Sequence, residues 1–416
     1  MLQILAQHQG SLFTLTGQHE QLAAMDHVTN LAIPRGALVL VTGSTGSVGS
    51  AVTNELLKAG LKVRAVVRSL EKGGYLSDVF EKRYGPNVFE IVHAENLLDS
   101  GVLEEAMKDC AGVVHMATDT SLGTSPDQVI TPTVNLARAV LGAAAKTPTV
   151  RRVVFTSLAA TLPRLHEPVH ITPSSWASDD IVRMAWSSSS SSSINDPTVK
   201  ALIVYAASKI EAERACWAFM REEGQQQQQQ QQPRRSFVLN TVVPMTCLGA
   251  LAHPRLVSSM NGMLLGTWRG DPAAADVMRA IGAQCHVDLE DLGLLHLAAL
   301  VLDDVSGERV LALGEVFQYE DVLDAMRKMD PARVERLLSA ETKEAEAKTS
   351  SSSLPGVRAT VERGRYKELL ARMGKEQPTG LEERIRRAVT SSTTSSWYRL
   401  ENGPPRIHDL SGGEIF

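Results

Sequence analysis

The segment that decides the fold is Thr42-Gly43-Ser44-Thr45-Gly46-Ser47-Val48-Gly49, which directly follows the apolar run Ala37–Val41. Glycines at this spacing permit a tight turn at Gly43, a close approach of backbone N–H groups to a pyrophosphate at Gly46, and tight packing of a following helix at Gly49. The start of that helix adds N–H donors and a partial positive charge. The segment predicts a dinucleotide site rather than an ordinary glycine-rich turn, with contacts from Gly43, Ser44, Thr45, Gly46, Ser47, Val48 and Gly49.

A regular alternation of apolar runs and helix-like stretches surrounds this loop. The runs are rich in Val and apolar on both faces, as strands of a buried parallel sheet are: Ala37–Val41, Val63–Val67, Val88–Val92, Val113–Met116, Val153–Phe155 and Phe237–Val243. Stretches long enough for crossover helices lie between them, such as Ser50–Ala59, Val102–Lys108 and Val134–Ala145. This pattern predicts an α/β fold with a doubly wound parallel Rossmann sheet.

The remaining segments suggest how the chain is divided. Residues 1–34 show no strong period and are expected to form a partly disordered N-terminal extension, followed by a dinucleotide-binding domain over 35–250. After Val243 the alternation weakens, so 251–416 is expected to form a smaller helix-rich substrate lobe and a C-terminal tail. The serine tract 187–193 and the glutamine tract 225–232 cannot bury a core and are expected to be flexible surface inserts.

The composition excludes several classes of protein. The formal net charge is −5, and no cluster of Lys and Arg is long enough to indicate nucleic-acid binding. The four cysteines are scattered, which argues against a disulfide framework or a zinc site. No apolar run reaches the roughly 18–20 residues of a membrane span, and the first basic residue is Arg35. We expect a cytoplasmic protein that binds no membrane and no metal.

Two basic residues after the second predicted strand bear on the choice of dinucleotide. Arg68 stands where NAD-binding proteins place an acidic residue that accepts hydrogen bonds from the ribose 2′-hydroxyl. An arginine there is suited to a 2′-phosphate, and Lys72 is a second candidate partner. Glu71 lies between them and weakens the case. The pattern favours NADP(H) over NAD(H), with two solvated surface cations as the alternative.

Tyr205 and Lys209 are the candidate catalytic pair. Their spacing places both side chains on one face of a helix that is expected to run to about Glu223. An ammonium group beside the phenol is expected to lower the pKa of Tyr205 below its usual value near 10, so that the phenol exchanges a proton at neutral pH. A third group should hydrogen-bond to the substrate oxygen. Ser157, directly after the fifth predicted strand, is the candidate, and a strand-ending serine that satisfies local backbone groups is the alternative.

Together these segments resemble the extended short-chain dehydrogenases/reductases, and within them the dihydroflavonol-4-reductase-like group that includes fungal aldehyde and ketone reductases. The resemblance covers Asn30–Val389. The segments that carry it are Val41–Gly49, Val63–Ser69, Val114–Thr118, Val153–Ser157, Val204–Lys209, Asn240–Pro244 and His286–Asp291. It implies hydride transfer from NADPH to a carbonyl, with the tyrosine as general acid and the serine as the partner of the oxygen.

The resemblance also assigns residues around the cofactor. It implies that Ala117 and Thr118 line the cofactor after the fourth strand, that the turn beginning at Pro244 touches its nicotinamide side, and that Asn96 and Leu97 lie by the adenine. Two positions depart from the family pattern. Asn96 replaces an aspartate. Leu158 occupies the place of the catalytic serine if no gap is allowed; Ser157 serves if the loop is shortened, and Thr161 is the fallback.

These observations lead to one main hypothesis and two alternatives. The main hypothesis is an NADPH-dependent reductase, a monomer or homodimer, that acts on the aldehyde or ketone carbonyl of a small organic molecule or secondary metabolite. An NAD-dependent epimerase or dehydratase on the same scaffold is the second reading, which Arg68 disfavours. The third is an NADP(H)-binding regulatory protein without turnover, which Leu158 and the two inserted tracts motivate.

Overall fold

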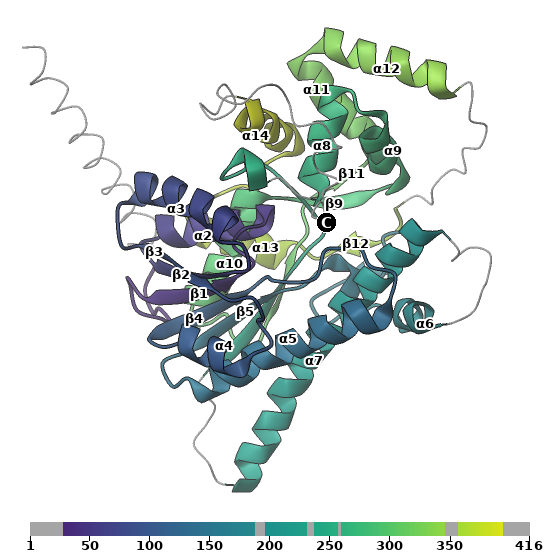
Figure 1. Cartoon of the computed structure of the whole chain (residues 1–416). Helices are drawn as coiled ribbons and strands as arrows, with labels where there is room; N and C mark the ends of the chain where they lie inside the picture. The colour runs from purple at the N-terminus through teal and green to yellow at the C-terminus, as the bar shows by residue number, and fades with distance from the viewer. Residues whose placement is uncertain (1–27, 188–195, 231–236, 257–258, 346–356, 394–416) are drawn as a thin grey trace, which may run out of the picture.

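A computed structural model of the chain describes residues 28–187, 196–230, 237–256, 259–345 and 357–393 (Figure 1). In this part of the chain the central element is a seven-stranded parallel sheet with the order β10-β7-β5-β4-β1-β2-β3. Its strands are β1 (Leu38–Thr42), β2 (Lys62–Val67), β3 (Phe89–His93), β4 (Cys110–His115), β5 (Arg152–Thr156), β7 (Val238–Pro244) and β10 (Arg309–Ala312). The predicted doubly wound sheet is confirmed.

The strand order determines where a ligand can bind. The chain proceeds outward from β1 to β2 and β3, and then returns to the other side of β1 to begin β4. In sheets of this kind ligands bind at the carboxyl ends of the strands where the order reverses. That point lies between β1 and β4, and the glycine loop leaves β1 at this edge of the sheet.

Helices cover both faces of the sheet (Figure 1). One face packs against α2 (Ser47–Lys58), α3 (Leu70–Tyr84), α10 (Leu289–Val301) and α13 (Gly364–Arg372). The other packs against α4 (Ser100–Ala106), α5 (Pro126–Lys146) and α7 (Pro197–Gln230). Successive strand residues point to opposite faces. In β5, for example, Val154 packs with the first group of helices, and Val153 and Phe155 pack with the second.

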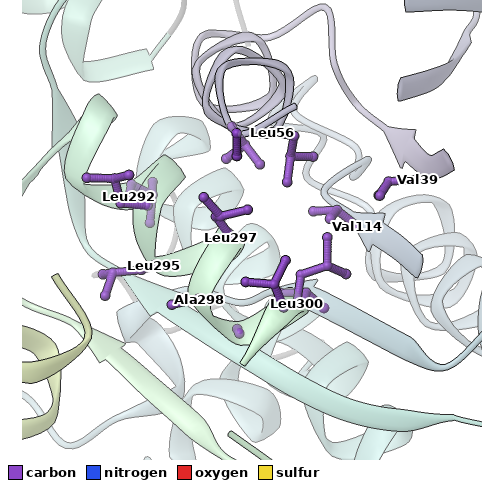
Figure 2. Packing of buried hydrophobic residues seen from close by; sticks show 14 of the residues in the cluster. Val39, Leu56, Val114, Leu292, Leu295, Leu297, Ala298 and Leu300 are labelled. Carbon is purple, nitrogen blue, oxygen red and sulfur yellow. The ribbon is translucent and has the colours of Figure 1, made fainter. Parts of the chain in front are cut away.

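The closest helix pair on the first face is α2 with α10. A Cβ on Gly293 would lie 2.6 Å from Cγ of Glu55, so only glycine allows this approach. Figure 2 shows the apolar side chains that fill the space between the two helices and the sheet. Every residue of α10 except Glu290 is buried. A helix that is apolar on nearly all sides is stable only when surrounded in this way.

A smaller lobe lies beyond the carboxyl edge of the sheet (Figure 1). It contains α8 (Ser259–Arg269), α9 (Pro272–Ala280), α11 (Tyr319–Met329), α12 (Pro331–Ala345) and α14 (Leu381–Thr393). A three-stranded sheet, β11-β9-β8, joins it to the main sheet: β8 (Thr246–Leu248), β9 (Gln284–Asp288) and β11 (Val316–Phe317). Asp288 caps α10 by accepting a hydrogen bond from the backbone N–H of Glu290 at 2.9 Å, so the acidic cluster here begins a helix.

Short elements complete the described chain. They are the helical turns η1 (Ala159–Thr161) and η2 (Pro254–Leu256), the helix α6 (Asp180–Trp186), and the paired strands β6 (His170–Ile171) and β12 (Thr360–Val361). The β6–β12 pair joins the segment after β5 to the segment before α13, two parts of the chain that are distant in sequence.

The structure differs from the sequence-based expectations at three places. Residues 28–34 are packed against the body of the protein, since the backbone N–H of Ala32 donates to Val301 and Ile33 is buried. Residues 225–230 of the glutamine tract continue α7 as helix and do not form a separate insert. The chain beyond residue 250 also contributes to the main sheet: β10 is one of its strands, and α10 and α13 pack on one of its faces. Residues 1–27, most of the serine tract and the end of the glutamine tract lie outside the described residues.

Asn240, fully buried in β7, ties these late elements to the sheet. Its side-chain amide donates to the carbonyls of Ala299 (2.7 Å) and Val305 (2.8 Å) and accepts from the N–H of Glu308 (2.9 Å). Asn240→Ala removes the side-chain partner of the Glu308 N–H and of the Ala299 carbonyl, while the Val305 carbonyl keeps its bond from Arg152 at 3.1 Å; an unpaired buried group costs about 1–3 kcal/mol. We expect the free energy of unfolding, measured by urea denaturation, to fall by about 2–4 kcal/mol. A change within about 0.5 kcal/mol would show that these bonds do not stabilise the sheet.

Candidate active site

The glycine loop has the backbone geometry that its sequence implies. Gly43 has φ = +79°, and a Cβ there would lie 2.8 Å from the backbone nitrogen of Ala117. A Cβ on Gly49 would lie 1.9 Å from the carbonyl oxygen of Gly43, so α2 can start this close to β1 only with glycine. At Gly46 the nearest such contact is 3.7 Å, an ordinary van der Waals contact, so a Cβ would fit there without strain.

The end of β4 is held beside this loop by Thr42. Its hydroxyl lies 2.7 Å from Nδ1 of His115 and accepts hydrogen bonds from the N–H groups of Met116 (3.3 Å) and Ala117 (3.2 Å). Burial lowers the pKa of His115 to about 3, and the charge of Lys209 adds to this shift, so the imidazole is neutral. His115 therefore has a structural role here, and it places the segment with Ala117 and Thr118 at the point where the strand order reverses.

Several polar groups at this edge have no protein partner among the described residues. The hydroxyls of Ser44 and Thr118 are buried and unpaired. The first turn of α2 contains no acidic residue, and no side chain caps it. Buried polar groups are normally satisfied, and a helix start of this kind suits an anion. These observations fit a phosphate-containing dinucleotide. The side chain of Ser47, by contrast, donates to the carbonyl of Leu256 at 2.9 Å.

The residues expected around the adenosine lie at the carboxyl ends of β2 and β3. The side chain of Arg68 is exposed, and Lys72 lies in the first turn of α3, where its N–H donates to the capping Ser69. The side chain of Asn96 is exposed and accepts from the N–H of Leu98 at 3.0 Å. Leu97 packs against the core of the second sheet face.

Tyr205 and Lys209 lie one turn apart on α7, which packs against α5, α6 and the helical turn η1 that follows β5. The ammonium of Lys209 donates to the carbonyl of Thr156 at 2.8 Å and lies 4.8 Å from the centre of the Phe155 ring. Burial lowers the pKa of Lys209 to about 8, while the neighbouring Cys216 and Glu213 oppose the shift. The lysine is therefore mostly charged at neutral pH and is fixed at the end of β5.

The expected effect of Lys209 on the pKa of Tyr205 is wrong for this structure. Burial raises the pKa of Tyr205 to about 12, and the nearby Cys247 adds to the shift. The reason is that loss of water destabilises the phenolate, whereas the ammonium is directed at the Thr156 carbonyl. A phenol with a raised pKa keeps its proton at neutral pH, so this site is suited to proton donation.

The hydroxyl of Ser157 is hydrogen-bonded within the protein. Its hydroxyl donates to the buried carboxylate of Glu213 at 2.5 Å, and its N–H donates to the Val242 carbonyl in β7. The fallback residue, Thr161, donates to the Leu158 carbonyl at 2.9 Å and accepts from Arg309 at 3.0 Å. The half-buried side chain of Leu158 offers no donor. The hydroxyls of Ser157 and Thr161 therefore both have protein partners, and a role of Ser157 at a substrate oxygen stays a prediction.

A buried ion pair behind the tyrosine and lysine was not anticipated from the sequence. Glu213, fully buried on α7, accepts from Arg309 of β10 at 2.8 Å and from Thr241 of β7 at 2.9 Å. Burial opposes ionisation, but the hydrogen bonds and charge of Arg309 outweigh it and keep the pKa of Glu213 below its usual value. Arg309 also lies 3.9 Å from the ring centre of Trp176. The available signal was the helical spacing of Glu213 from Lys209; nothing local marked Arg309 as its partner.

Two further features of the described residues bear on the kind of site. No helix among them is long and apolar enough to cross a membrane. Within the same residues no group of three or more His, Cys, Asp or Glu side chains is arranged to hold a metal ion.

Comparison with known proteins identifies the family. A model of the NAD dependent epimerase/dehydratase family matches residues 39–228. The chain is 35% identical over 311 residues to the NAD-dependent epimerase/dehydratase terH of Aspergillus terreus, which covers 74% of this chain and 86% of that protein. It is also 35% identical over 313 residues to aldehyde reductase 2 of Sporidiobolus salmonicolor, with coverage of 74% and 86%. The chain belongs to the NAD dependent epimerase/dehydratase family, the extended branch of the short-chain dehydrogenases/reductases.

Solved structures agree with the fold. The yeast methylglyoxal/isovaleraldehyde reductase Gre2, complexed with NADPH, superposes with a TM-score of 0.62 at 20% identity and covers 85% of this chain and 98% of that one. At this identity the likeness concerns the fold alone. It matches the seven-stranded sheet with helices on both faces and supports the predicted fold class.

Gly46 and Gly49 form a matched pair for testing the loop. Gly49→Ala puts a Cβ onto the Gly43 carbonyl, so we expect the free energy of unfolding to fall by about 1–3 kcal/mol. Gly46→Ala meets no close neighbour, so stability should hold while the methyl group obstructs a bound pyrophosphate. Urea denaturation and calorimetric titration with NADP⁺ measure the two effects. Wild-type binding by Gly46→Ala would show that phosphates do not approach this position.

Ser157→Ala separates a structural from a catalytic serine. Because the hydroxyl donates to the buried Glu213, we expect the free energy of unfolding to fall by about 1.5–3 kcal/mol. The turnover number with an accepted carbonyl substrate should change by less than about tenfold. A loss of about 10²–10³ in turnover at unchanged stability would place the hydroxyl at the substrate oxygen instead.

Proposed function

We propose that this protein is an NADPH-dependent reductase that converts the aldehyde or ketone carbonyl of a small organic molecule or secondary metabolite to an alcohol. The observation that carries the proposal is the pairing of Tyr205 with Lys209 on α7, with the ammonium fixed at the carboxyl end of β5. The glycine loop and the unpaired hydroxyls of Ser44 and Thr118 lie at the same edge of the sheet. Relatives named aldehyde reductase support the same chemistry.

The proposed reaction divides between cofactor and protein. When bound, NADPH supplies a hydride to the carbonyl carbon and leaves as NADP⁺. The carbonyl oxygen gains negative charge as the hydride arrives, and the Tyr205 phenol donates its proton to that oxygen. A phenol with a pKa of about 12 is a stronger acid than the alcohol that forms, so the transfer is favourable. Lys209, charged at neutral pH and held at the end of β5, is the expected partner of the nicotinamide ribose.

The proposed preference for NADPH depends on residues just after the end of β2 and at the start of α3. Arg68 takes the position of an acidic residue that would accept hydrogen bonds from a 2′-hydroxyl, and Lys72 follows in the first turn of α3. Guanidinium groups pair well with phosphate oxygens. The glycine loop, Asn96, Leu97, Ala117, Thr118 and Pro244 are the remaining proposed cofactor contacts.

A second candidate function is an NADP(H)-binding protein without turnover. It is favoured by the hydrogen bonds that occupy the hydroxyls of Ser157 and Thr161, and by Leu158 at the position of the family's catalytic serine. Loss of one donor to an oxyanion lowers turnover by about 10²–10³. Binding of NADPH by calorimetry, without oxidation of NADPH in the presence of any carbonyl compound tested, would favour this candidate.

Tyr205→Phe tests the proposed reductase. We expect NADPH oxidation with a panel of aldehydes and ketones to fall by about 10²–10⁴, because the proton donor is lost. NADPH affinity should stay within about twofold, since the phenol is not a phosphate contact. Tyr84→Phe is the matched control, because the Tyr84 hydroxyl lies 2.9 Å from Asn54, away from the sheet's carboxyl edge. Equal turnover of wild type and Tyr205→Phe would exclude the proton-donor role.

A further inference from the structure

The segment that leads into the smaller lobe touches the helix that begins beside Arg68. His253 and Arg255, in the turn that contains η2, both contact Tyr75 of α3. The His253 and Tyr75 rings stack with centroids 5.0 Å apart and an interplanar angle of 7°. The Arg255 guanidinium lies 5.3 Å from the centre of the same ring. The two parts of the protein are therefore joined at α3, the helix that begins just after Arg68.

Hydrogen bonds run through this contact from the arginine to a carboxylate. Arg255 Nη1 donates to the Tyr75 hydroxyl at 2.7 Å, and that hydroxyl donates to Glu71 Oε1. The bond to Glu71 is the main reason that the pKa of Tyr75 is raised, so the phenol keeps its proton and serves as the donor. Glu71 and Tyr75 are one turn apart on α3, so the carboxylate is drawn along the helix, away from its first residues.

The turn itself is anchored to the start of α2. The Ser47 hydroxyl donates to the Leu256 carbonyl at 2.9 Å, and the side chains of His253 and Leu256 are buried. Arg255 therefore projects from a segment fixed at both the glycine loop and α3. The backbone that carries Arg255 is therefore held in place, which favours its hydrogen bond to Tyr75.

Glu71 is an acidic residue beside the expected phosphate partners in sequence, and its charge opposes NADP(H). It lies between Arg68 and Lys72 in sequence and stands in the first turn of α3. A carboxylate directed toward the helix start would repel a 2′-phosphate, and acidic groups in this region are the ones that accept the 2′-hydroxyl of NAD. The protein therefore needs to hold Glu71 elsewhere if it is to prefer the phosphorylated cofactor.

We propose that Arg255, acting through Tyr75, is a positioning residue for cofactor choice: the Arg255–Tyr75–Glu71 relay holds the Glu71 carboxylate away from the 2′-phosphate of NADP(H) and offsets its charge. The proposal rests on the proposed NADPH preference and adds a determinant from the segment leading into the substrate lobe. Arg68 and Lys72 attract the phosphate, and the relay removes the opposing charge. NAD(H), which lacks the phosphate, is not sensitive to the relay.

The test measures the dissociation constants of NADP⁺ and NAD⁺ by calorimetry on the full chain, without any substrate. Tyr75→Phe keeps the ring and removes the relay, and Arg255→Gln removes the charge. For each variant we expect the dissociation constant of NADP⁺ to rise about two- to fivefold, the range of exposed charge interactions, with that of NAD⁺ unchanged. In a Glu71→Gln background the same two changes should have less than about 1.5-fold effect.

Matched controls and distinct outcomes keep the inference testable. Tyr84→Phe removes a hydroxyl from the same helix, and Arg279→Gln removes an arginine that lies 4.7 Å from the Tyr319 ring in the smaller lobe; neither should alter cofactor choice. A weaker NADP⁺ affinity of Arg255→Gln that persists in the Glu71→Gln background would overturn the relay in favour of direct phosphate contact. If wild type prefers NADP⁺ but Tyr75→Phe leaves the dissociation constant of NADP⁺ unchanged, the relay is overturned and the cofactor proposal stands. Tighter binding of NAD⁺ than NADP⁺ by wild type would overturn the cofactor proposal as well.

Discussion

The carboxylate of Glu213 lies in the interior of the protein, between α7 and the strands β7 and β10. A buried charge is tolerated only when it is paired and fully hydrogen-bonded. Here Arg309, Thr241 and Ser157 meet that requirement together, and each comes from a different strand or strand end. Removing one partner of such a pair typically costs about 3–5 kcal/mol. The interaction therefore sets the position of α7 against the sheet, and with it the position of Tyr205 and Lys209.

The same constraint explains the least expected property of the site. A serine after β5 is a natural choice for the donor to a substrate oxygen, but the carboxylate beneath it is a stronger attraction for its hydroxyl. Lys209 behaves similarly: with the Thr156 carbonyl within 2.8 Å, the ammonium is directed to the end of β5. Ser157 and Lys209 are thus both hydrogen-bonded to the protein itself, and burial is the main reason that the phenol of Tyr205 holds its proton.

The sequence was sufficient to predict the strands of the main sheet as far as β7, and the turn at the glycine loop, because those signals are local. Gly43 and Gly49 predict a turn in which no larger residue fits. The Val-rich runs predict strands that are buried on both faces. The strand β10 was missed because Arg-Val-Leu-Ala is short and begins with a charged residue whose partner is distant. The protein partner of Ser157 was missed for the same reason. Its hydrogen bond depends on Glu213, 56 residues away, and no periodicity encodes that contact.

The Glu213–Arg309 pair closes a loop of 96 residues, so it has a consequence for the order in which the protein is assembled. Contacts between distant residues form late, because the chain between them must first be ordered. The glycine loop and the end of β4 need only the first 120 residues or so of the chain, as the bonds from Thr42 to His115 and Ala117 show. Tyr205 and Lys209 are synthesised about 100 residues before Arg309, and until β10 is added the helix that carries them faces a sheet without its outermost strand. The catalytic end of this protein is therefore completed from its C-terminal half.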